Sequence, residues 1–176
     1  MFVCTANICR SPMAEGIWNS LVCFPRASSI GIWARPGLVM DSSAAAQLAA
    51  RDVDANLIDA FRSRPLTAAA VARAGLVLCM EDAHAEAVVA LTPAAADKTF
   101  TVLELAEIVR RHPGGSWRDL RRLRQGVLRG DVADPFGHPE SEFALVAECI
   151  EDALTAIAGW EGWDEFSWAM RDQFPT

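Results

Sequence analysis

The chain has 176 residues, of which 52% are hydrophobic and 22% are charged, a composition typical of one globular domain with a sizeable core. Its 16 Lys and Arg against 23 Asp and Glu leave a formal net charge of −7, which argues against nonspecific binding to nucleic acid or to an anionic membrane surface. No uncharged apolar segment approaches the roughly 18 residues of a membrane-spanning helix. We therefore expect a cytoplasmic protein with no nucleic-acid and no membrane partner.

The cysteines and histidines indicate neither a disulfide framework nor a metal site. Five cysteines are an odd number, and in the cytoplasm we expect them to be reduced. The sequence contains no Cys-x-x-Cys pair and no cluster of Cys and His, so it predicts no metal and no cofactor. Since His84, His112 and His138 have no ligand spacing, we expect all three on the surface.

Short apolar segments that are typical of strands alternate along the chain with helical patterns. The sequence predicts strands at residues 1–4, 29–33, 76–80 and 99–103. It predicts helices from Ser11 onward and at residues 42–51, 66–74, 82–91, 103–111, 117–128 and 141–158. Strands separated by helices imply right-handed crossovers and a parallel sheet. We predict an α/β fold, with a four-stranded parallel sheet and helices on both faces.

Local signals set the expected limits of these elements. Ser11 followed by Pro12 is typical of an N-cap and a first helical residue, and Ser42 or Ser43 can cap the next helix. We expect residues 1–158 to form one domain. Residues 159–176 form a tail rich in Trp and Phe, which we expect either to pack on the domain or to form a dimer contact. The protein is expected to be a monomer or a weak homodimer.

The loop between the first predicted strand and the first helix has the pattern of a phosphate-binding loop. Ligands of parallel sheets bind beyond the carboxyl ends of strands, where amides at a helix start face outward. The predicted phosphate-binding residues are Thr5, Ala6, Asn7, Ile8, Cys9, Arg10 and Ser11. Arg10 can hold two phosphate oxygens in a fork. The amides, the helix dipole and Arg10 would favour the thiolate of Cys4, which we predict to be a nucleophile.

The spacing Cys-x5-Arg is a weak signal by itself, because any of five cysteines could meet it by chance. Cys4 is the one cysteine that does. The strand before Cys4, the Ser-Pro start of the helix after it, and Asn7 inside the loop make the pattern more specific. Asn tolerates the left-handed backbone conformation that such a loop can need.

Phosphoryl transfer to a thiolate also needs an acid for the leaving group. The loop from Gly130 to Pro139 offers two carboxylates, Asp131 and Asp134. Pro135 restricts the backbone of the residue before it and would help to aim a side chain from a loop. We therefore predict that Asp134 is the general acid, with Asp131 as the alternative.

These motifs resemble those of the low-molecular-weight protein-tyrosine phosphatases, in their bacterial branch. The resemblance rests on Val3–Glu15 and Asp134–Gly137, with weaker similarity at residues 29–31, 62–66 and 76–80. It implies a cytoplasmic, metal-free enzyme that hydrolyses aryl phosphate in phosphotyrosine-containing proteins.

The resemblance also implies roles for individual residues. Cys4 would form a phosphocysteine intermediate, and Asp134 would act first as general acid and then as general base. Ser11 would donate a hydrogen bond to the thiolate. Cys9 would form a reversible disulfide with the nucleophile. Trp33 and Phe136 would line the substrate cleft.

Two features depart from this family. Relatives usually have glycine where Ala6 stands, and alanine restricts the backbone if a positive φ is required there. The first strand is also shorter than in relatives, which we attribute to a late start-site assignment or to trimming. The Arg-rich stretch at residues 110–129 is expected to be a solvated helix face, or alternatively a docking surface for acidic phosphopeptides.

Three other functions remain open at this stage. Protein-arginine phosphatases share the fold but carry threonine where this chain has Ile8. A thiol-dependent arsenate reductase needs two further cysteines after the third strand, and Cys79 stands near that region alone. A phosphotyrosine-binding pseudo-phosphatase is disfavoured because Cys4, Arg10 and Asp134 are all present.

Overall fold

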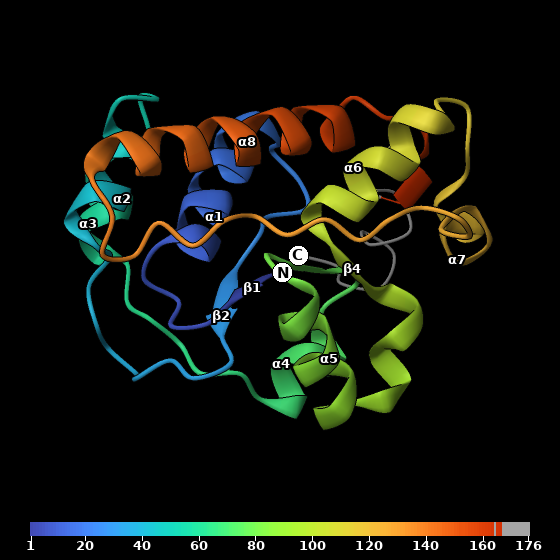
Figure 1. Cartoon of the computed structure of the whole chain (residues 1–176), viewed down its shortest axis with the longest axis horizontal. Helices are drawn as coiled ribbons and strands as arrows, with labels where there is room; N and C mark the ends of the chain where they lie inside the picture. Colours follow the sequence, from blue (N-terminus) through green and yellow to red (C-terminus); the bar gives the residue numbers. More distant parts are fainter. Residues whose placement is uncertain (164, 167–176) are drawn as a thin grey trace.

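The computed structural model describes residues 1–163 and 165–166 (Figure 1). In these residues one four-stranded sheet has the strand order β2-β1-β3-β4, and every pair is parallel. The strands are β1 Phe2–Cys4, β2 Ser29–Gly31, β3 Val77–Cys79 and β4 Thr99–Thr101. The predicted α/β class and the parallel four-stranded sheet are confirmed.

Helices cover both faces of this sheet (Figure 1). Helices α1, α6 and α8 lie on one face, and α4 and α5 lie on the other. The α-helices are α1 Arg10–Leu21, α2 Ser42–Ala49, α3 Ala55–Ala60, α4 Ala68–Arg73, α5 Asp82–Leu91, α6 Val102–Arg111, α7 Leu120–Leu123 and α8 Glu140–Ala158. Two 3₁₀ turns are η1 Pro93–Lys98 and η2 Trp117–Asp119. No helix of the described residues is long and apolar enough to cross a membrane.

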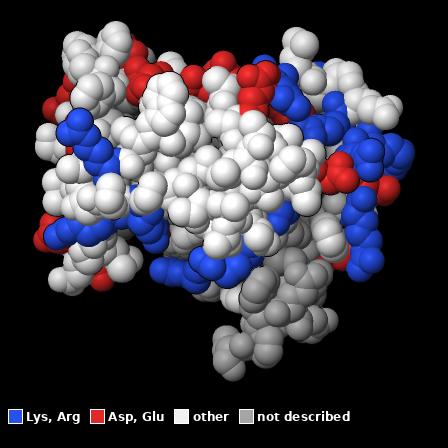
Figure 2. All heavy atoms as spheres, turned by 90° about the horizontal axis from the view of Figure 1, so that it is seen from below, with Lys and Arg blue, Asp and Glu red and all other residues white. Residues whose placement is uncertain are grey.

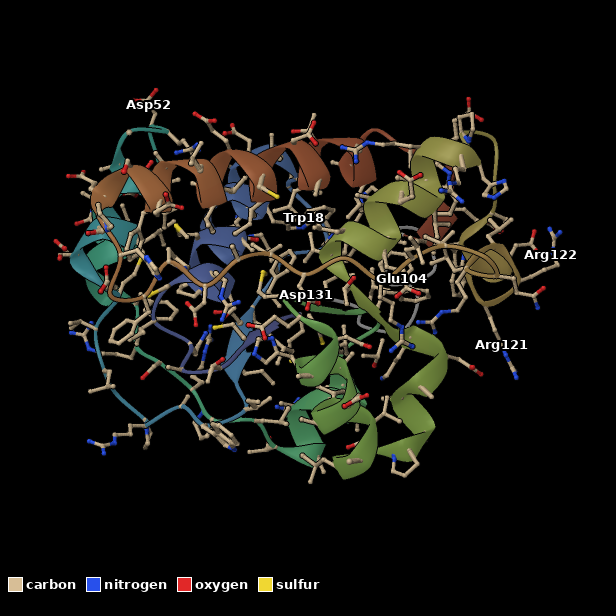
Figure 3. The ribbon with its side chains drawn as sticks, viewed as in Figure 1. Trp18, Asp52, Glu104, Arg121, Arg122 and Asp131 are labelled. Atoms are coloured by element: carbon tan, nitrogen blue, oxygen red, sulfur yellow. The ribbon has the colours of Figure 1, made fainter. Side chains whose placement is uncertain are left out.

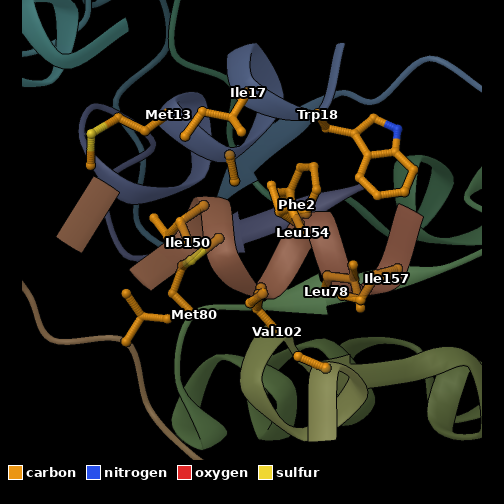
Figure 4. Packing of buried hydrophobic residues seen from close by; sticks show 14 of the residues in the cluster. Phe2, Met13, Ile17, Trp18, Leu78, Met80, Val102, Ile150, Leu154 and Ile157 are labelled. Carbon is orange, nitrogen blue, oxygen red and sulfur yellow. The ribbon is translucent and has the colours of Figure 1, made fainter. Parts of the chain in front are cut away.

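Alternation along the strands divides the core into two parts. Successive residues of a strand point to opposite faces of the sheet. Phe2 and Leu78 therefore join the larger cluster beneath α1, α6 and α8, where Figure 4 shows them with Leu154 of α8. Val3 and Val77 point the other way and join the smaller cluster beneath α4 and α5. All strand residues are buried, as expected for a sheet covered on both faces.

The face that α4 and α5 cover carries little charge at its centre. Figure 2 looks onto this face and shows a broad uncharged area with Lys and Arg around it. The composition of the helices explains this, because α4 and α5 are rich in alanine.

The start of α1 differs from the sequence-based expectation. The helix begins at Arg10, and Cys9 is its N-cap residue. Ser11 is therefore not the N-cap, because its hydroxyl contacts the Cys4 thiol instead, at 2.9 Å. Pro12 still lies in the first turn, where its missing N–H leaves no helical hydrogen bond unmade.

Other limits also shift. Asp41, rather than either serine after it, caps α2 by accepting from the amides of Ser43 and Ala44. Helix α3 was not predicted, because it contributes no buried residue and therefore shows no apolar periodicity. The helix predicted over residues 117–128 is broken into η2 and α7, and Gly126 follows with φ +76°.

Aromatic residues after α8 are buried against the sheet-covering helices. The ring of Trp163 lies 4.7 Å from that of Trp18 on α1, and the ring of Phe166 lies 5.6 Å from that of Trp117. Trp160 donates from its indole nitrogen to the carbonyl of His112 at 2.8 Å. The remaining tail aromatics, Trp168 and Phe174, lie outside the described residues.

The arginines of residues 110–129 form ion pairs with carboxylates of this chain. Side chains such as Arg121 and Arg122 point outward (Figure 3). The pairs are Arg110–Asp152, Arg111–Glu107, Arg118–Glu165, Arg121–Asp97, Arg122–Asp119, Arg124–Glu104 and Arg129–Asp82. This favours the solvated-face interpretation over a docking surface, because each arginine already has a carboxylate partner.

One of these pairs is buried and invites a stability test. Glu104 is 2% exposed, and it accepts from Arg124 at 3.0 Å while its other oxygen accepts from the Thr101 amide. Arg124→Ala should lower the free energy of unfolding by about 2–4 kcal/mol. The reason is that the buried Glu104 carboxylate would keep only the more distant guanidinium of Arg129, at 3.9 Å. Arg122→Ala, which removes an exposed pair with Asp119, should cost less than about 1 kcal/mol. Denaturant unfolding measures both, and equal losses would contradict this account.

Candidate active site

The loop between β1 and α1 curls around the sulfur of Cys4, which is 3% exposed. The backbone amide of Asn7 donates to Sγ at 3.3 Å, and the Ser11 hydroxyl lies 2.9 Å from Sγ. Cys4 pairs in register with Gly31 of β2, and β1 lies between β2 and β3. The thiol therefore lies at the carboxyl end of a central strand, within hydrogen-bonding distance of the Asn7 amide and the Ser11 hydroxyl.

Asn7 organises this loop from below. It is fully buried and has φ +54°, which confirms the predicted left-handed conformation. Its side-chain nitrogen, Nδ2, donates to the hydroxyls of Ser11 and of Ser29 in β2, at 2.9 and 2.8 Å. Its oxygen accepts from the Arg64 backbone amide at 2.8 Å. One side chain thus joins the loop to α1, to β2 and to the segment before α4.

A close approach of two backbones fixes the loop against β2. A Cβ added to Gly31 would lie 2.7 Å from the Asn7 nitrogen and 2.7 Å from the Thr5 oxygen, so a side chain at this position would displace the loop. The backbone amides of Ile32 and Trp33 donate to the backbone carbonyls of Cys4 and Thr5, each at 2.9 Å. The loop backbone is therefore held by β2 and the two residues after it.

Alanine at position 6 does not strain the backbone. The non-glycine residues with positive φ in the described part of the chain are Asn7 and Asp52. Because Ala6 has no positive φ, the fold does not require glycine there. This removes the reason for concern about the departure from the family pattern.

Arg10 is the charged centre of the site. Its side chain is 2% exposed, yet its two terminal nitrogens reach three partners. One nitrogen, Nη1, contacts the Glu81 carboxylate and the Val132 carbonyl, the latter at 2.8 Å; the other, Nη2, lies 2.8 Å from Asp134 Oδ2. The guanidinium therefore links the phosphate loop to the end of β3 and to the loop before α8.

The two aspartates of that loop have different surroundings. Asp131 accepts from the amide of Asp82 at 2.8 Å and so caps the start of α5 (Figure 3). Asp134 instead faces Arg10 and is about half exposed, with its other oxygen accepting from the Phe136 amide at 3.2 Å. Of the two carboxylates, Asp134 is the one next to the phosphate loop.

Cys9 lies in the same loop but in a different environment. It is 4% exposed, and burial, followed by the charge of Asp41, raises the pKa of its thiol to about 12. Cys9 is therefore protonated at neutral pH. The start of α2 holds the loop here, because the amide of its N-cap residue Asp41 donates to the Ile8 carbonyl at 2.9 Å. Ile8 itself is half-buried and packs against the main core.

The aromatic residues expected in the substrate cleft are both exposed. Trp33 is 80% exposed and Phe136 is 62% exposed, so neither belongs to the core. Trp33 is attached to the phosphate loop through its hydrogen bond to Thr5, and Phe136 follows Asp134 by two residues. Their role in a substrate cleft stays a prediction.

Two site residues were missed by sequence reasoning. Glu81 pairs with Arg10, and His84 lies 2.9 Å from the Thr5 hydroxyl. The expectation that His84 is on the surface is wrong: it is 2% exposed, because α5 packs its first turn against the phosphate loop. The signal in the sequence was the position of Glu81 and His84 just after the third strand, whose carboxyl end shares an edge with the end of β1.

Chemically, the site combines a thiol, the backbone amide of Asn7 that donates to it, a buried guanidinium and a half-exposed carboxylate. Within the described residues no group of three His, Cys, Asp or Glu side chains is placed to hold a metal ion. A thiol facing such an oxyanion cradle is typical of enzymes that transfer a phosphoryl group to cysteine.

Comparisons with known proteins agree with this class. The family model described as low molecular weight phosphotyrosine protein phosphatase matches residues 1–115. The chain is 30% identical to a protein-arginine-phosphatase of Geobacillus stearothermophilus, over 90% of this chain and 92% of the relative. It is 34% identical to the low molecular weight protein-tyrosine-phosphatase Etp of Escherichia coli K12, over 87% of each chain.

Solved structures give the same result. The arginine phosphatase YwlE from Geobacillus stearothermophilus superposes with a TM-score of 0.73 at 27% identity, covering 99% of this chain and 96% of that one. A low molecular weight protein tyrosine phosphatase from T. tengcongensis superposes with a TM-score of 0.68 at 32% identity, covering 89% and 94%. The chain belongs to the low molecular weight phosphotyrosine protein phosphatase family. It is a hydrolase, and the family acts on phosphorylated proteins.

Proposed function

We propose that this chain hydrolyses phosphotyrosine in proteins, through a phosphocysteine intermediate and without a metal or cofactor. The observation that carries the proposal is the link between Arg10 and Asp134, at 2.8 Å, beside the loop that surrounds Cys4. It brings a nucleophile, a phosphate-binding cation and a proton donor to one edge of the sheet.

In the first step the Cys4 thiolate attacks phosphorus, and the bond from phosphorus to the phenol oxygen breaks. The substrate phosphoryl group takes the place of Asp134 beside Arg10, and Asp134 in its protonated form gives its proton to the leaving oxygen. The loop amides and Arg10 bind the phosphoryl oxygens, whose charge they stabilise in the transition state. Trp33 and Phe136 contact the phenol ring.

In the second step a water molecule attacks the phosphocysteine. Asp134, now a carboxylate, accepts a proton from that water, and the bond from sulfur to phosphorus breaks. The Cys4 thiolate leaves while accepting a hydrogen bond from Ser11. Inorganic phosphate is released, and Asp134 is protonated again for the next turnover.

The roles of Cys4 and Asp134 can be tested with a matched aspartate. Cys4→Ser should abolish turnover, because a serine hydroxyl offers no comparable anion. Asp134→Ala should lower kcat about 10²–10⁴-fold on phenyl phosphates with poor leaving groups, and less on activated phenols, which need little protonation. Asp131→Ala should leave kcat within about 3-fold and lower stability by about 1 kcal/mol, through the lost cap of α5. Equal losses of kcat in the two aspartate variants would refute the role of Asp134.

Protein-arginine phosphatase activity is the second candidate, because relatives and a solved structure carry that name. Ile8 favours phosphotyrosine over phosphoarginine. Its branched apolar side chain offers no hydrogen bond, so a guanidinium beside it would have donors without partners, at a cost of about 1–3 kcal/mol.

The two substrates can be compared directly. We expect kcat/KM to be roughly 10- to 100-fold higher for phosphotyrosine peptides than for matched phosphoarginine peptides. Ile8→Thr should narrow or invert this ratio, whereas Ile8→Val, which is branched but lacks a hydroxyl, should keep it. A wild-type preference for phosphoarginine would overturn the substrate assignment and leave the Cys4 chemistry intact.

The remaining alternatives have less support. An arsenate reductase would need a cysteine relay, but Cys79 is fully buried in β3, and burial raises the pKa of its thiol. A pseudo-phosphatase would be expected if Ala6 distorted the loop, and the backbone at Ala6 does not have a positive φ. A thiol nucleophile requires a reducing compartment, so we assign the enzyme to the cytoplasm. We also propose residues 1–158 as its phosphatase domain.

Cys9 is proposed to protect the nucleophile against over-oxidation. Peroxide would convert Cys4 to a sulfenic acid, and the Cys9 thiolate would attack its sulfur to form a disulfide, releasing hydroxide that takes up a proton to become water. Because the pKa of Cys9 is about 12, its thiolate fraction rises about tenfold per pH unit near neutrality.

This assigns a pH dependence to the protection. After peroxide treatment, recovery of activity with dithiothreitol should improve between pH 7 and pH 9 in the wild type. In Cys9→Ser it should stay incomplete, while Cys23→Ser, which changes an exposed cysteine, should behave as wild type. Recovery that is equal in wild type and Cys9→Ser would make Cys9 a packing residue of the loop.

A further inference from the structure

His84 contacts the phosphate loop from the side opposite to β2. It lies in the first turn of α5 and is 2% exposed. Its Nε2 atom is 2.9 Å from Oγ1 of Thr5, the residue that follows Cys4, across 79 residues of sequence. This joins the loop around the thiol to the helix after β3.

The other surroundings of the ring make this bond its main polar contact. Nδ1 is buried and has no hydrogen-bond partner, and Nε2 lies 3.8 Å from Glu81 Oε1, the oxygen that pairs with Arg10. Burial lowers the pKa of His84, against the opposing effect of the Glu81 charge. His84 is therefore uncharged at neutral pH, and its bond to Thr5 offsets part of the cost of burying a polar ring.

Thr5 is consequently held at two different atoms. Its carbonyl accepts from the amide of Trp33, which follows β2, and its hydroxyl bonds His84 on α5. The two contacts lie on opposite sides of the residue that starts the loop. Displacement of Thr5 would require one of them to break, so the pair fixes the first residue of the loop after Cys4.

We propose that His84 is a positioning residue of the phosphatase reaction, which holds Thr5 and thereby the phosphate loop around Cys4. This rests on the proposed function only in so far as activity is the readout, because the loop binds inorganic phosphate whichever substrate is natural. No contact of His84 with the thiol or with Arg10 is seen in the described residues, and it acts through its hydrogen bond to Thr5. To hold Thr5, the side chain at position 84 needs one atom at the position of Nε2 that can donate or accept a hydrogen bond.

The test compares variants that keep or remove that atom. Glutamine places an amide group where Nε2 lies and can donate or accept, whereas leucine fills the space without a polar atom. His84→Leu should lower kcat/KM about 10-fold and weaken calorimetric binding of inorganic phosphate several-fold, the usual effect of a lost buried hydrogen bond. His84→Gln should stay within about 3-fold of wild type in both measurements.

The same bond can be removed from the loop side, which covers the case that a His84 variant does not fold. Thr5→Val should reproduce the losses of His84→Leu, and Thr5→Ser should retain function. The double variant Thr5→Val/His84→Leu should be no worse than either single variant, because both remove one interaction. Additive losses of kcat/KM in the double variant would show that His84 only fills the core. Equal losses of kcat/KM in His84→Gln and His84→Leu, in proportion to their losses of unfolding free energy, would show the same.

The outcomes separate this inference from the proposed function. If the wild type hydrolyses neither phosphotyrosine nor phosphoarginine peptides, the proposed function fails. The phosphate-binding arm still decides the role of His84, since it measures the loop directly. If Thr5→Val and His84→Leu both bind phosphate as tightly as wild type, the inference is overturned whatever the activities are.

Discussion

The guanidinium of Arg10 is a full positive charge inside the protein, and the site depends on how it is neutralised. Its side chain is 2% exposed, and a buried charge is stable only when it is paired and hydrogen-bonded. Its three partners come from two other segments: Glu81 follows β3, whereas the Val132 carbonyl and Asp134 belong to the loop before α8. Pairing Arg10 thus assembles the phosphate loop, the β3–α5 junction and the loop before α8 into one site.

A second network, made of hydrogen bonds and one ion pair, holds the loop around Asn7. Asn7 bonds to Ser29, whose hydroxyl donates to Glu15 of α1 at 2.6 Å. The same Glu15 oxygen lies 2.7 Å from the guanidinium of Arg64, and Arg64 also gives its backbone amide to Asn7. A closed ring of contacts therefore surrounds the left-handed residue of the loop. This ring fixes the loop at Asn7, and in the proposed reaction a loop held in this way would stabilise the charge of the transition state.

Relatives of this chain carry the names of two activities, on phosphotyrosine and on phosphoarginine, and the proposed mechanism is compatible with both. In that mechanism Cys4, the loop and Arg10 act on the phosphoryl group, which the two substrates have in common. Discrimination must come from side chains at the rim, where the leaving group lies. The side chains proposed to lie there are the half-buried Ile8 and the exposed rings of Trp33 and Phe136, an apolar set that would suit an aromatic leaving group better than a guanidinium with several donors.

Much of the fold and the heart of the loop follow from short-range patterns in the sequence. Strand-sized apolar segments between helices predicted the parallel sheet, since parallel strands need helical crossovers. Cys4, Asn7 and Arg10 lie within seven residues of one another, so one turn from strand to helix brings them together. The sequence could also single out Asp134, because proline after it is a local constraint.

Only the tertiary structure decided which distant side chains complete the site. Arg10 and Glu81 are separated by 71 residues, and Thr5 and His84 by 79, so no local periodicity relates them. The start of α1 shifted for the same reason: Ser11 is a good N-cap by composition, but its hydroxyl is used by the thiol across the loop. Residue type and spacing determine what a turn can do locally, whereas the pairing of buried charges and polar groups depends on which strand ends share an edge of the sheet.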